Sequence, residues 1–143
     1  MIDMKLLVDS SVFIDAFDPA SPNHAESMRF LDHIHKREVI MAMPAHAWFE
    51  VECALKKLSL DKKFVGPEFD GQMRYPVELI DIDDDFITKY RMADIPYIKA
   101  GDHIFVAVAK VNNYPLVTND KKMFNVAREA GVRVFEPKDL RRE

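Results

Sequence analysis

Four acidic residues occupy positions where an α/β fold would bring them to one end of a parallel sheet. Asp9 ends the apolar run LLV, and Asp120 follows the run PLVTN. Asp102 opens the helical stretch GDHIFVAVAK, and Glu50 lies inside the apolar-rich segment AHAWFEVECAL. Four carboxylates gathered in one cleft would repel one another strongly unless a cation lay among them. Mg²⁺ and Mn²⁺ prefer oxygen ligands, so the pattern predicts a metal site whose commonest partner is a phosphate group.

The three aspartates also have a structural interpretation as helix caps. Asp102 and Asp120 each stand at the start of a helical stretch, where an aspartate side chain accepts backbone hydrogen bonds. Asp9 could serve the same purpose, although Ser10 or Ser11 would do so equally well. Taken one at a time, these positions do not distinguish a cap from a metal ligand.

The glutamate of the group has a competitor two residues away. A helix turns by ~100° per residue, which puts Glu50 at one edge of an apolar stripe and Glu52 near the other edge. Helical periodicity therefore does not choose between the two glutamates, and both could be solvated. The stripe consists of Trp48, Val51, Ala54, Leu55 and Leu58.

Strand-like apolar runs alternate with segments of helical periodicity along the chain. Strands are expected at 4–8, 39–43, 77–82, 116–118 and 132–135. Helices are expected at 11–17, 24–36, 44–58, 84–93, 102–111 and 121–130, with a loop at 59–75. This alternation predicts a mainly parallel sheet covered by helices on both faces. Ligands of such sheets bind beyond the carboxyl ends of the strands, which is the edge where Asp9 and Asp120 are expected.

Composition limits the class of protein. The chain has 143 residues, of which 48% are hydrophobic and 31% charged, and we expect residues 1–143 to form a single domain. The start of the sequence lacks the pattern of a signal peptide, and no apolar run suggests a membrane span. Cys53 is the only cysteine, which fits a reducing, cytoplasmic setting.

The net charge of −4 argues against binding nucleic acid through a broad basic surface. It does not exclude a nuclease. Catalytic carboxylates lower the net charge, and a bound metal ion restores positive potential locally.

Read together, the motifs resemble the PIN domain. VDSSVFID comes first, then an acid in the helix after the second strand, then GDHIFVAVA and VTNDKKMF, over nearly the whole stretch from Leu6 to Pro137. The resemblance implies a three-layer α/β/α fold with a mainly parallel five-stranded sheet between helices. It also implies a metal-dependent ribonuclease, most often the VapC-type toxin of a bacterial or archaeal toxin–antitoxin pair.

The family's catalytic and metal-holding positions carry over residue by residue. The resemblance assigns the first aspartate to Asp9 and the glutamate of the third helix to Glu50, with Glu52 a less favoured reading. It assigns the remaining ligands to Asp102 and Asp120. Ser11 matches a hydroxyl that supports the first aspartate, and Thr118 opens the T-x-D signature that contains Asp120.

The implied chemistry is hydrolysis of RNA. One or two Mg²⁺ or Mn²⁺ ions would activate a water molecule and neutralise the charge that develops on the phosphoryl oxygens. The expected products are a 5′-phosphate and a 3′-hydroxyl. The resemblance further implies RNA as substrate, an antitoxin protein as partner and a homodimer, whose interface the apolar residues of the second and third helices could supply.

Two other functions compete with this interpretation. The first is a catalytically inactive PIN fold that acts as an RNA-binding or assembly module. The second is a phospho-accepting receiver-like signalling domain, which also places acids and Mg²⁺ at strand ends. Asp81 and Asp83 are candidate phospho-acceptors, but Lys138 is a poor match for the lysine that such a domain needs after its last strand.

Overall fold

A computed structural model describes residues 5–61, 77–91 and 93–140 of the chain. These residues form a five-stranded, all-parallel sheet with the strand order β3-β2-β1-β4-β5. The predicted α/β class is confirmed. The strands are β1 (Leu6–Val8), β2 (Met41–Pro44), β3 (Val77–Ile80), β4 (Leu116–Val117) and β5 (Val134–Phe135).

Strand β1 lies at the centre of the sheet, between β2 and β4. Leu6 pairs with Met41 of β2, and Leu7 pairs with Leu116 of β4. A receiver-type sheet has the order 2-1-3-4-5, in which the first strand has the second and third as its neighbours. The observed order is different, and it excludes the receiver-like alternative.

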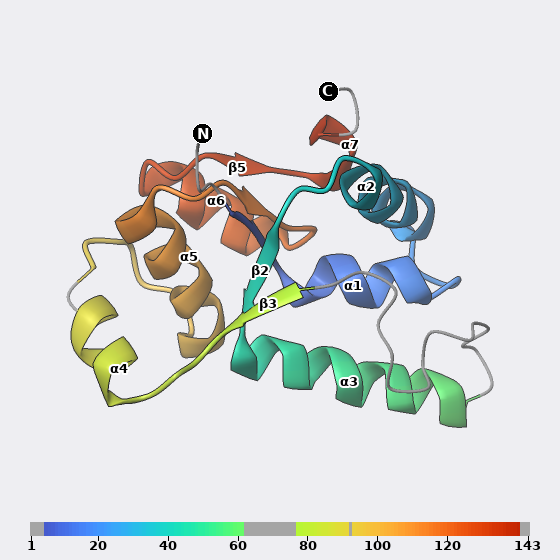
Figure 1. Cartoon of the computed structure of the whole chain (residues 1–143), viewed down its shortest axis with the longest axis horizontal. Helices are drawn as coiled ribbons and strands as arrows, with labels where there is room; N and C mark the ends of the chain where they lie inside the picture. Colours follow the sequence, from blue (N-terminus) through green and yellow to red (C-terminus); the bar gives the residue numbers. More distant parts are fainter. Residues whose placement is uncertain (1–4, 62–76, 92, 141–143) are drawn as a thin grey trace.

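Helices cover both faces of the sheet (Figure 1). Helix α1 packs against α2 and α3 on one side, whereas α5 packs against α4 and α6 on the other. The helices are α1 (Ser10–Phe17), α2 (His24–Lys36), α3 (Ala45–Leu60), α4 (Asp84–Tyr90), α5 (Ala100–Asn112), α6 (Lys121–Glu129) and the short α7 (Pro137–Leu140), which packs against α2. None of the described helices has the length and apolar character needed to cross a membrane.

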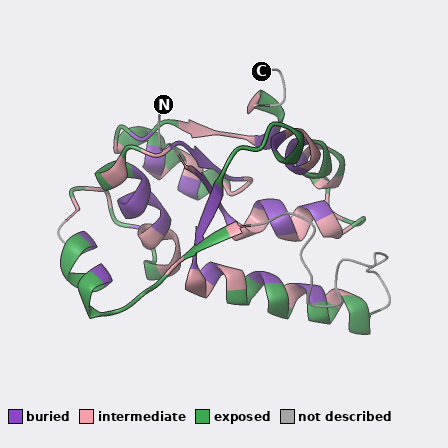
Figure 2. Cartoon of the chain, viewed as in Figure 1, coloured by how far each residue is buried: buried purple, intermediate pink, exposed green. Residues whose placement is uncertain are grey.

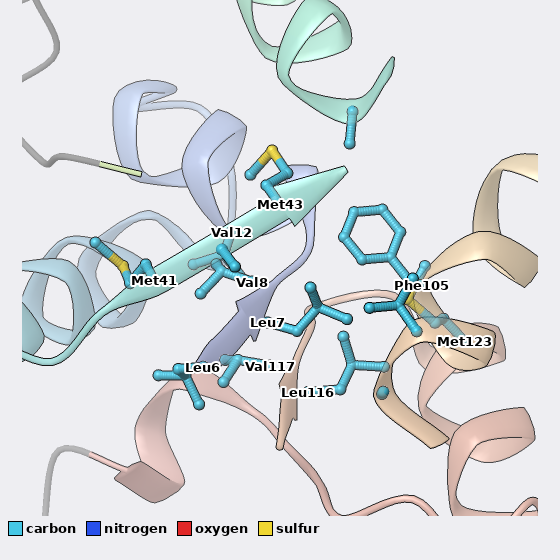
Figure 3. Close-up of a cluster of buried hydrophobic side chains, with 14 of the residues drawn as sticks. Leu6, Leu7, Val8, Val12, Met41, Met43, Phe105, Leu116, Val117 and Met123 are labelled. Atoms are coloured by element: carbon cyan, nitrogen blue, oxygen red, sulfur yellow. The ribbon is translucent and has the colours of Figure 1, made fainter. Parts of the chain in front are cut away.

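The central strand is buried on both of its faces (Figure 2). Leu7 lies toward Phe105 of α5, whereas Val8 lies beside Val12 of α1 (Figure 3). All four side chains are almost completely excluded from solvent. Burial on both faces explains why this strand appears in the sequence as a continuous apolar run rather than an alternating one.

A glycine closes the end of helix α6. Gly131 has φ = +85°, a left-handed conformation that glycine adopts without a steric penalty. Its N–H donates to Arg128 O at 3.1 Å, and the N–H of Val132 donates to Ala127 O at 2.9 Å. These two bonds satisfy the last carbonyls of the helix in a Schellman motif.

Several predicted boundaries were wrong. Pro44 was expected to start a helix, but it ends β2 and takes the cap position of α3 in an extended conformation (φ −60°, ψ 144°). Ser59 and Leu60 were expected in a loop, but they form the last residues of α3. The rest of that predicted loop, from residue 62 onward, lies outside the described residues. Helix α7 was not predicted, since four residues give no detectable periodicity.

Candidate active site

The acids of interest lie at the edge of the sheet formed by the carboxyl ends of the strands. Asp9 directly follows β1, and its backbone N–H donates to Val117 O at the end of β4 at 2.9 Å. Asp120 stands three residues beyond Val117. The side-by-side pairing of β1 and β4 therefore brings these two aspartates to one place, although 110 residues separate them in sequence.

Helices α3 and α5 bring the other two acids to the same edge. Helix α3 starts where β2 ends. Helix α5 ends just before β4 begins, so the start of α5 lies at the edge formed by the carboxyl ends of the strands. One contact joins the two helix starts directly, since His46 Nε2 lies 3.2 Å from Gly101 O. Glu50 stands one turn after His46, so the two side chains share a face of α3.

Two hydroxyl groups hold the Asp9 carboxylate. Its Oδ2 accepts hydrogen bonds from Ser11 Oγ at 2.7 Å and from Thr118 Oγ1 at 2.8 Å. Thr118 is fully buried, and Asp9 itself is 4% exposed. Both residues that the sequence marked as supporting groups are thus in direct contact with the first aspartate.

The pKa of Asp9 is raised above its usual range. Burial is the largest cause, because it disfavours the charged form, and repulsion from Asp102 and Asp120 adds to it. The bonds from Ser11 and Thr118 offset part of this effect by stabilising the carboxylate. The three aspartates are therefore close enough to act on one another electrostatically.

Asp102 does not cap its helix. Helix α5 begins at Ala100, and Lys99 occupies the cap position without a side-chain hydrogen bond. The N–H of Asp102 donates to Lys99 O at 3.1 Å, as expected for a residue already inside the first turn. The capping interpretation of Asp102 is therefore wrong, and its carboxylate can stabilise the start of the helix only through the helix dipole.

Asp102 interacts electrostatically with other acids of the predicted site. Its pKa is raised, first by partial burial, then by repulsion from Asp120 and, more weakly, from Glu50. The positive charges of Lys99 and Lys122 act in the opposite direction. Glu50, rather than Glu52, is the glutamate whose charge acts on Asp102, although both glutamates are exposed on α3.

Asp120, by contrast, does cap a helix. Its Oδ1 accepts hydrogen bonds from the N–H groups of Lys122 at 2.9 Å and Met123 at 3.1 Å, at the start of α6. Both capping bonds go to the same oxygen, so Oδ2 takes no part in the cap. Its own N–H donates to Thr118 Oγ1 at 2.9 Å, and that hydroxyl donates in turn to Asp9. Capping and a place in the acid cluster are compatible.

A polar network behind the acids was missed in the sequence. Asn119 donates from Nδ2 to Asp15 Oδ2 at 2.8 Å and to Ser27 Oγ at 2.9 Å. Its backbone N–H donates to Ser11 Oγ at 3.1 Å, and Ser11 donates to Asp9. The one sign of this network in the sequence is Ser27, a polar residue on the apolar face of α2. A fully buried hydroxyl needs a hydrogen-bond partner, so Ser27 implied a polar neighbour.

The chemistry of the acid cluster suits a hard divalent cation. Carboxylate oxygens are the ligands that Mg²⁺ and Mn²⁺ prefer, and a cation would relieve the mutual repulsion of the acids. Throughout the part of the chain that the structure describes, no group of three or more His, Cys, Asp or Glu side chains is close enough together to enclose a metal ion. The acids interact through their charges, and a coordination shell would need their side chains to converge further.

The sequence matches a known family over most of its length. The model of the PIN domain family matches residues 6–129, which include all four acids. The chain therefore belongs to the PIN domain family, whose members are in general nucleases that use divalent metal ions. A comparison with curated proteins found no match.

Solved structures share the fold at low sequence identity. The VapBC2 structure from Rickettsia felis, bound to a DNA fragment from its promoter, is 16% identical, with a TM-score of 0.60 over 93% of this chain and 98% of that one. VapC20 from Mycobacterium tuberculosis, a toxin that cleaves the sarcin–ricin loop, is 13% identical (TM-score 0.60; 89% and 95% covered). FitAcB from Neisseria gonorrhoeae is 19% identical (TM-score 0.56; 94% and 99% covered). At these identities the similarity establishes the fold alone.

Proposed function

We propose that this protein is a Mg²⁺- or Mn²⁺-dependent ribonuclease that hydrolyses phosphodiester bonds of RNA, built as one PIN domain. The observation that carries the proposal is the set of hydrogen bonds that joins the elements bearing Asp9, Glu50, Asp102 and Asp120: Thr118 links Asp120 to Asp9, and His46 links the start of α3 to the start of α5. These acids come from four separate elements of a PIN fold and meet at the edge where parallel α/β sheets bind ligands. Structural needs alone do not explain why Asp102 and Glu50 join this edge.

The four acids would hold the metal, and the metal would supply Lewis-acid stabilisation and a water of lowered pKa. Ser11 and Thr118 keep the Asp9 carboxylate in one orientation through hydrogen bonds of 2.7 and 2.8 Å. Those bonds also favour its ionised form, which is the form that binds a cation. Lys99 and Lys122, whose charges act on Asp102, would attract the phosphate backbone toward the acids.

The test is cleavage of single-stranded RNA with Mg²⁺ or Mn²⁺ and after addition of EDTA. We expect products with 5′-phosphate and 3′-hydroxyl ends only when the metal is present, and none from Asp9→Asn. Asp32→Asn, an acid of α2 outside the cluster, is the matched control and should cleave as wild type does. Cleavage that persists in EDTA, or in Asp9→Asn, would refute the metal-dependent mechanism.

We further propose that the protein is the cytoplasmic toxin of a type II toxin–antitoxin pair. The support is its fold, which it shares with VapC20 and with the VapBC2 and FitAcB structures. The proposed partner is an antitoxin protein that covers the acid cluster. Purification from the native host tests this: we expect a second protein to co-purify and to suppress cleavage. Recovery of an active enzyme alone, with no effect on growth when overexpressed, would argue against the toxin role.

The alternative within the same family is an inactive PIN fold that binds RNA or assembles with proteins. Such a protein would bind single-stranded RNA without cleaving it at any metal concentration. The presence of all four acids, with hydroxyl bonds that orient Asp9, favours the enzyme.

A further inference from the structure

A small pocket opens beside the acid cluster, on the side of β5. Its volume is about 200 Å³, and it is lined by Thr118, Asn119, Asp120, Lys121, Phe124, Asn125 and Glu136. Pockets for drug-sized ligands are larger, from about 300 Å³ upward. This pocket therefore suits one flat ring system rather than a whole nucleotide.

The pocket shares its wall with the proposed active site. Asp120 belongs to both, and Thr118 reaches Asp9 from the pocket's inner end through its 2.8 Å hydrogen bond. Glu136 directly follows β5, whose pairing with β4 places it at the same edge of the sheet. A group bound here would lie next to a phosphate held at the acid cluster.

One side of the pocket is aromatic. Phe124, on the first turn of α6, is half-buried and borders the pocket. The guanidinium of Arg128 lies over its ring, 5.6 Å from the ring centre, one turn further along the helix. Aromatic rings beside arginine are a recurring surface for stacking bases of single-stranded nucleic acid.

The polar lining selects against a phosphate and in favour of a base. Asp120 and Glu136 both line the pocket, and their negative charges would repel a phosphate group. Glu136, which is not one of the proposed metal ligands, would instead accept hydrogen bonds from the donors on the edge of a base. Glu136 pairs with Lys138 only at 3.8 Å and with both side chains partly in solvent, so its carboxylate can turn toward a ligand at small cost.

Guanine is the base whose edge fits a carboxylate best. Its N1–H and its amino group are adjacent donors, so a single carboxylate can accept two parallel bonds from it, whereas the other bases offer one donor group on that edge. Specific recognition of RNA uses such edge contacts on unpaired, splayed-out bases. Lys121, exposed at the pocket, is placed to meet the backbone of the same strand.

We propose that this pocket is a base-binding subsite that takes an unpaired guanine of the RNA strand next to the phosphate to be cleaved. The proposal rests on the proposed ribonuclease function and adds to it a preference for cleavage beside guanine. Glu136 determines the preference, and Phe124 supplies the stacking surface.

The test measures base binding without cleavage. The four ribonucleosides, which carry no phosphate for the acids to repel, are titrated in EDTA into ¹⁵N-labelled protein, and the amide signals of α6 and Glu136 are followed by NMR. We expect guanosine to shift these signals with an affinity about tenfold higher than the other three. Glu136→Gln, which replaces one acceptor oxygen by a donor, should abolish the preference. Phe124→Leu should weaken all four by about tenfold.

Matched controls lie outside the pocket. Glu129→Gln makes the same charge change at the other end of α6, and Tyr114→Leu removes a half-buried ring at the opposite edge of the sheet. Both should bind as wild type does, and the amide spectrum of each variant verifies its fold.

RNA cleavage by a protein whose pocket signals do not move would overturn the subsite and leave the ribonuclease intact. Guanine binding by a protein that cleaves no RNA would support the subsite as a binding site and overturn the ribonuclease. Equal affinity for all four nucleosides would refute the role of Glu136.

Discussion

At the scale of single residues, the ionised acids of the site repel one another, and a bound cation would relieve this repulsion. Asp9 is buried beside two other aspartates, and Asp102 is partly buried beside Asp120 and Glu50. Burial and like charge both raise the pKa of a carboxyl group, and both therefore destabilise the folded protein when its carboxyls are ionised. This cost is understandable if the site exists for binding a cation.

The charge of Asp102 should destabilise the protein when no metal is bound. Asp102→Asn removes one negative charge from the cluster and disturbs no helix cap, since Lys99 holds that position. We therefore expect a higher melting temperature than wild type in EDTA at pH 7, a smaller rise in melting temperature on adding Mn²⁺, and loss of RNA cleavage. Thermal melts with and without Mn²⁺ measure the first two effects. Unchanged stabilisation by Mn²⁺ together with normal cleavage would remove Asp102 from the site.

The effect of Asp102→Asn should depend on pH. The pKa of Asp102 is raised in the folded protein, so between its unfolded value of about 4 and the raised value the folded state binds more protons than the unfolded state. The free energy of unfolding therefore falls as pH rises through this window. The advantage of the variant in EDTA should be present at pH 7 and disappear below pH of about 4. An advantage that persists in acid would trace to something other than the lost charge.

The two glutamates of α3 should differ in their importance. Glu50 acts electrostatically on Asp102, and it stands one turn beyond His46, which contacts the start of α5. We expect Glu50→Gln to reduce cleavage by about a hundredfold or more, as loss of a group that holds transition-state charge does. Glu52→Gln, an equally exposed neighbour, is the control and should retain most activity. Equal losses in two well-folded variants would show that the wrong face of α3 has been assigned to the site.

At the scale of elements, the turn between β4 and α6 is the structural centre of the site. Thr118 reaches Asp9, Asn119 reaches α1 and α2, and Asp120 caps α6. Three consecutive residues thus connect the end of the first strand, two helices on one face of the sheet and one helix on the other face. The positions of Asp9 and Asp120 relative to each other depend on this turn.

Asn119 should stabilise the fold as well as position the acids. Asn119→Ala leaves Asp15 without its 2.8 Å bond and the fully buried Ser27 without its 2.9 Å bond. Asp15 keeps a longer bond from Asn23 Nδ2 at 3.4 Å. Leaving the buried Ser27 hydroxyl without a partner costs about 1–3 kcal/mol, which urea unfolding can measure. We expect kcat for cleavage to fall, because the acids would be held less firmly. Asn125→Ala, exposed on α6, should change the free energy of unfolding by less than about 0.5 kcal/mol.

At the scale of the whole molecule, large apolar side chains are exposed on two of the helices. Phe49 is 69% exposed and Leu60 is 73% exposed, both on α3, and Met28 of α2 is 38% exposed. Large exposed apolar groups that form one contiguous patch are typical of association surfaces. They fall on the two helices from which the sequence led us to expect a dimer interface.

We therefore expect a homodimer in solution, built through α2 and α3. Light scattering after gel filtration should give about twice the 16.5 kDa chain mass. Leu60→Glu should shift the protein to a monomer, because a charge at a symmetric interface meets its own copy. Ile87→Glu, an exposed apolar residue of α4 on the other side of the sheet, is the control and should remain a dimer. A monomeric wild-type protein would contradict this assignment.

The sequence by itself determined the fold class, the order of the strands and helices along the chain, and the family. Buried parallel strands are short apolar runs, and amphipathic helices repeat their apolar residues every three to four positions, so both leave a local signal. Element boundaries were less certain. Lys99 occupies the cap position of α5 without a side-chain hydrogen bond. Aspartate is a common cap residue, so the helix was predicted to start at Asp102, two residues after its actual start.

Only the tertiary structure decided which acids meet and which other residues join them. Glu50 and Glu52 are equivalent by helical periodicity, and the packing of α3 against the start of α5 is what distinguishes them. The same holds for Asn119 and Ser27, 92 residues apart, and for the pocket that brings Glu136 beside Phe124. Such contacts arise from strand order and helix packing. These are long-range properties that no local pattern in the sequence encodes.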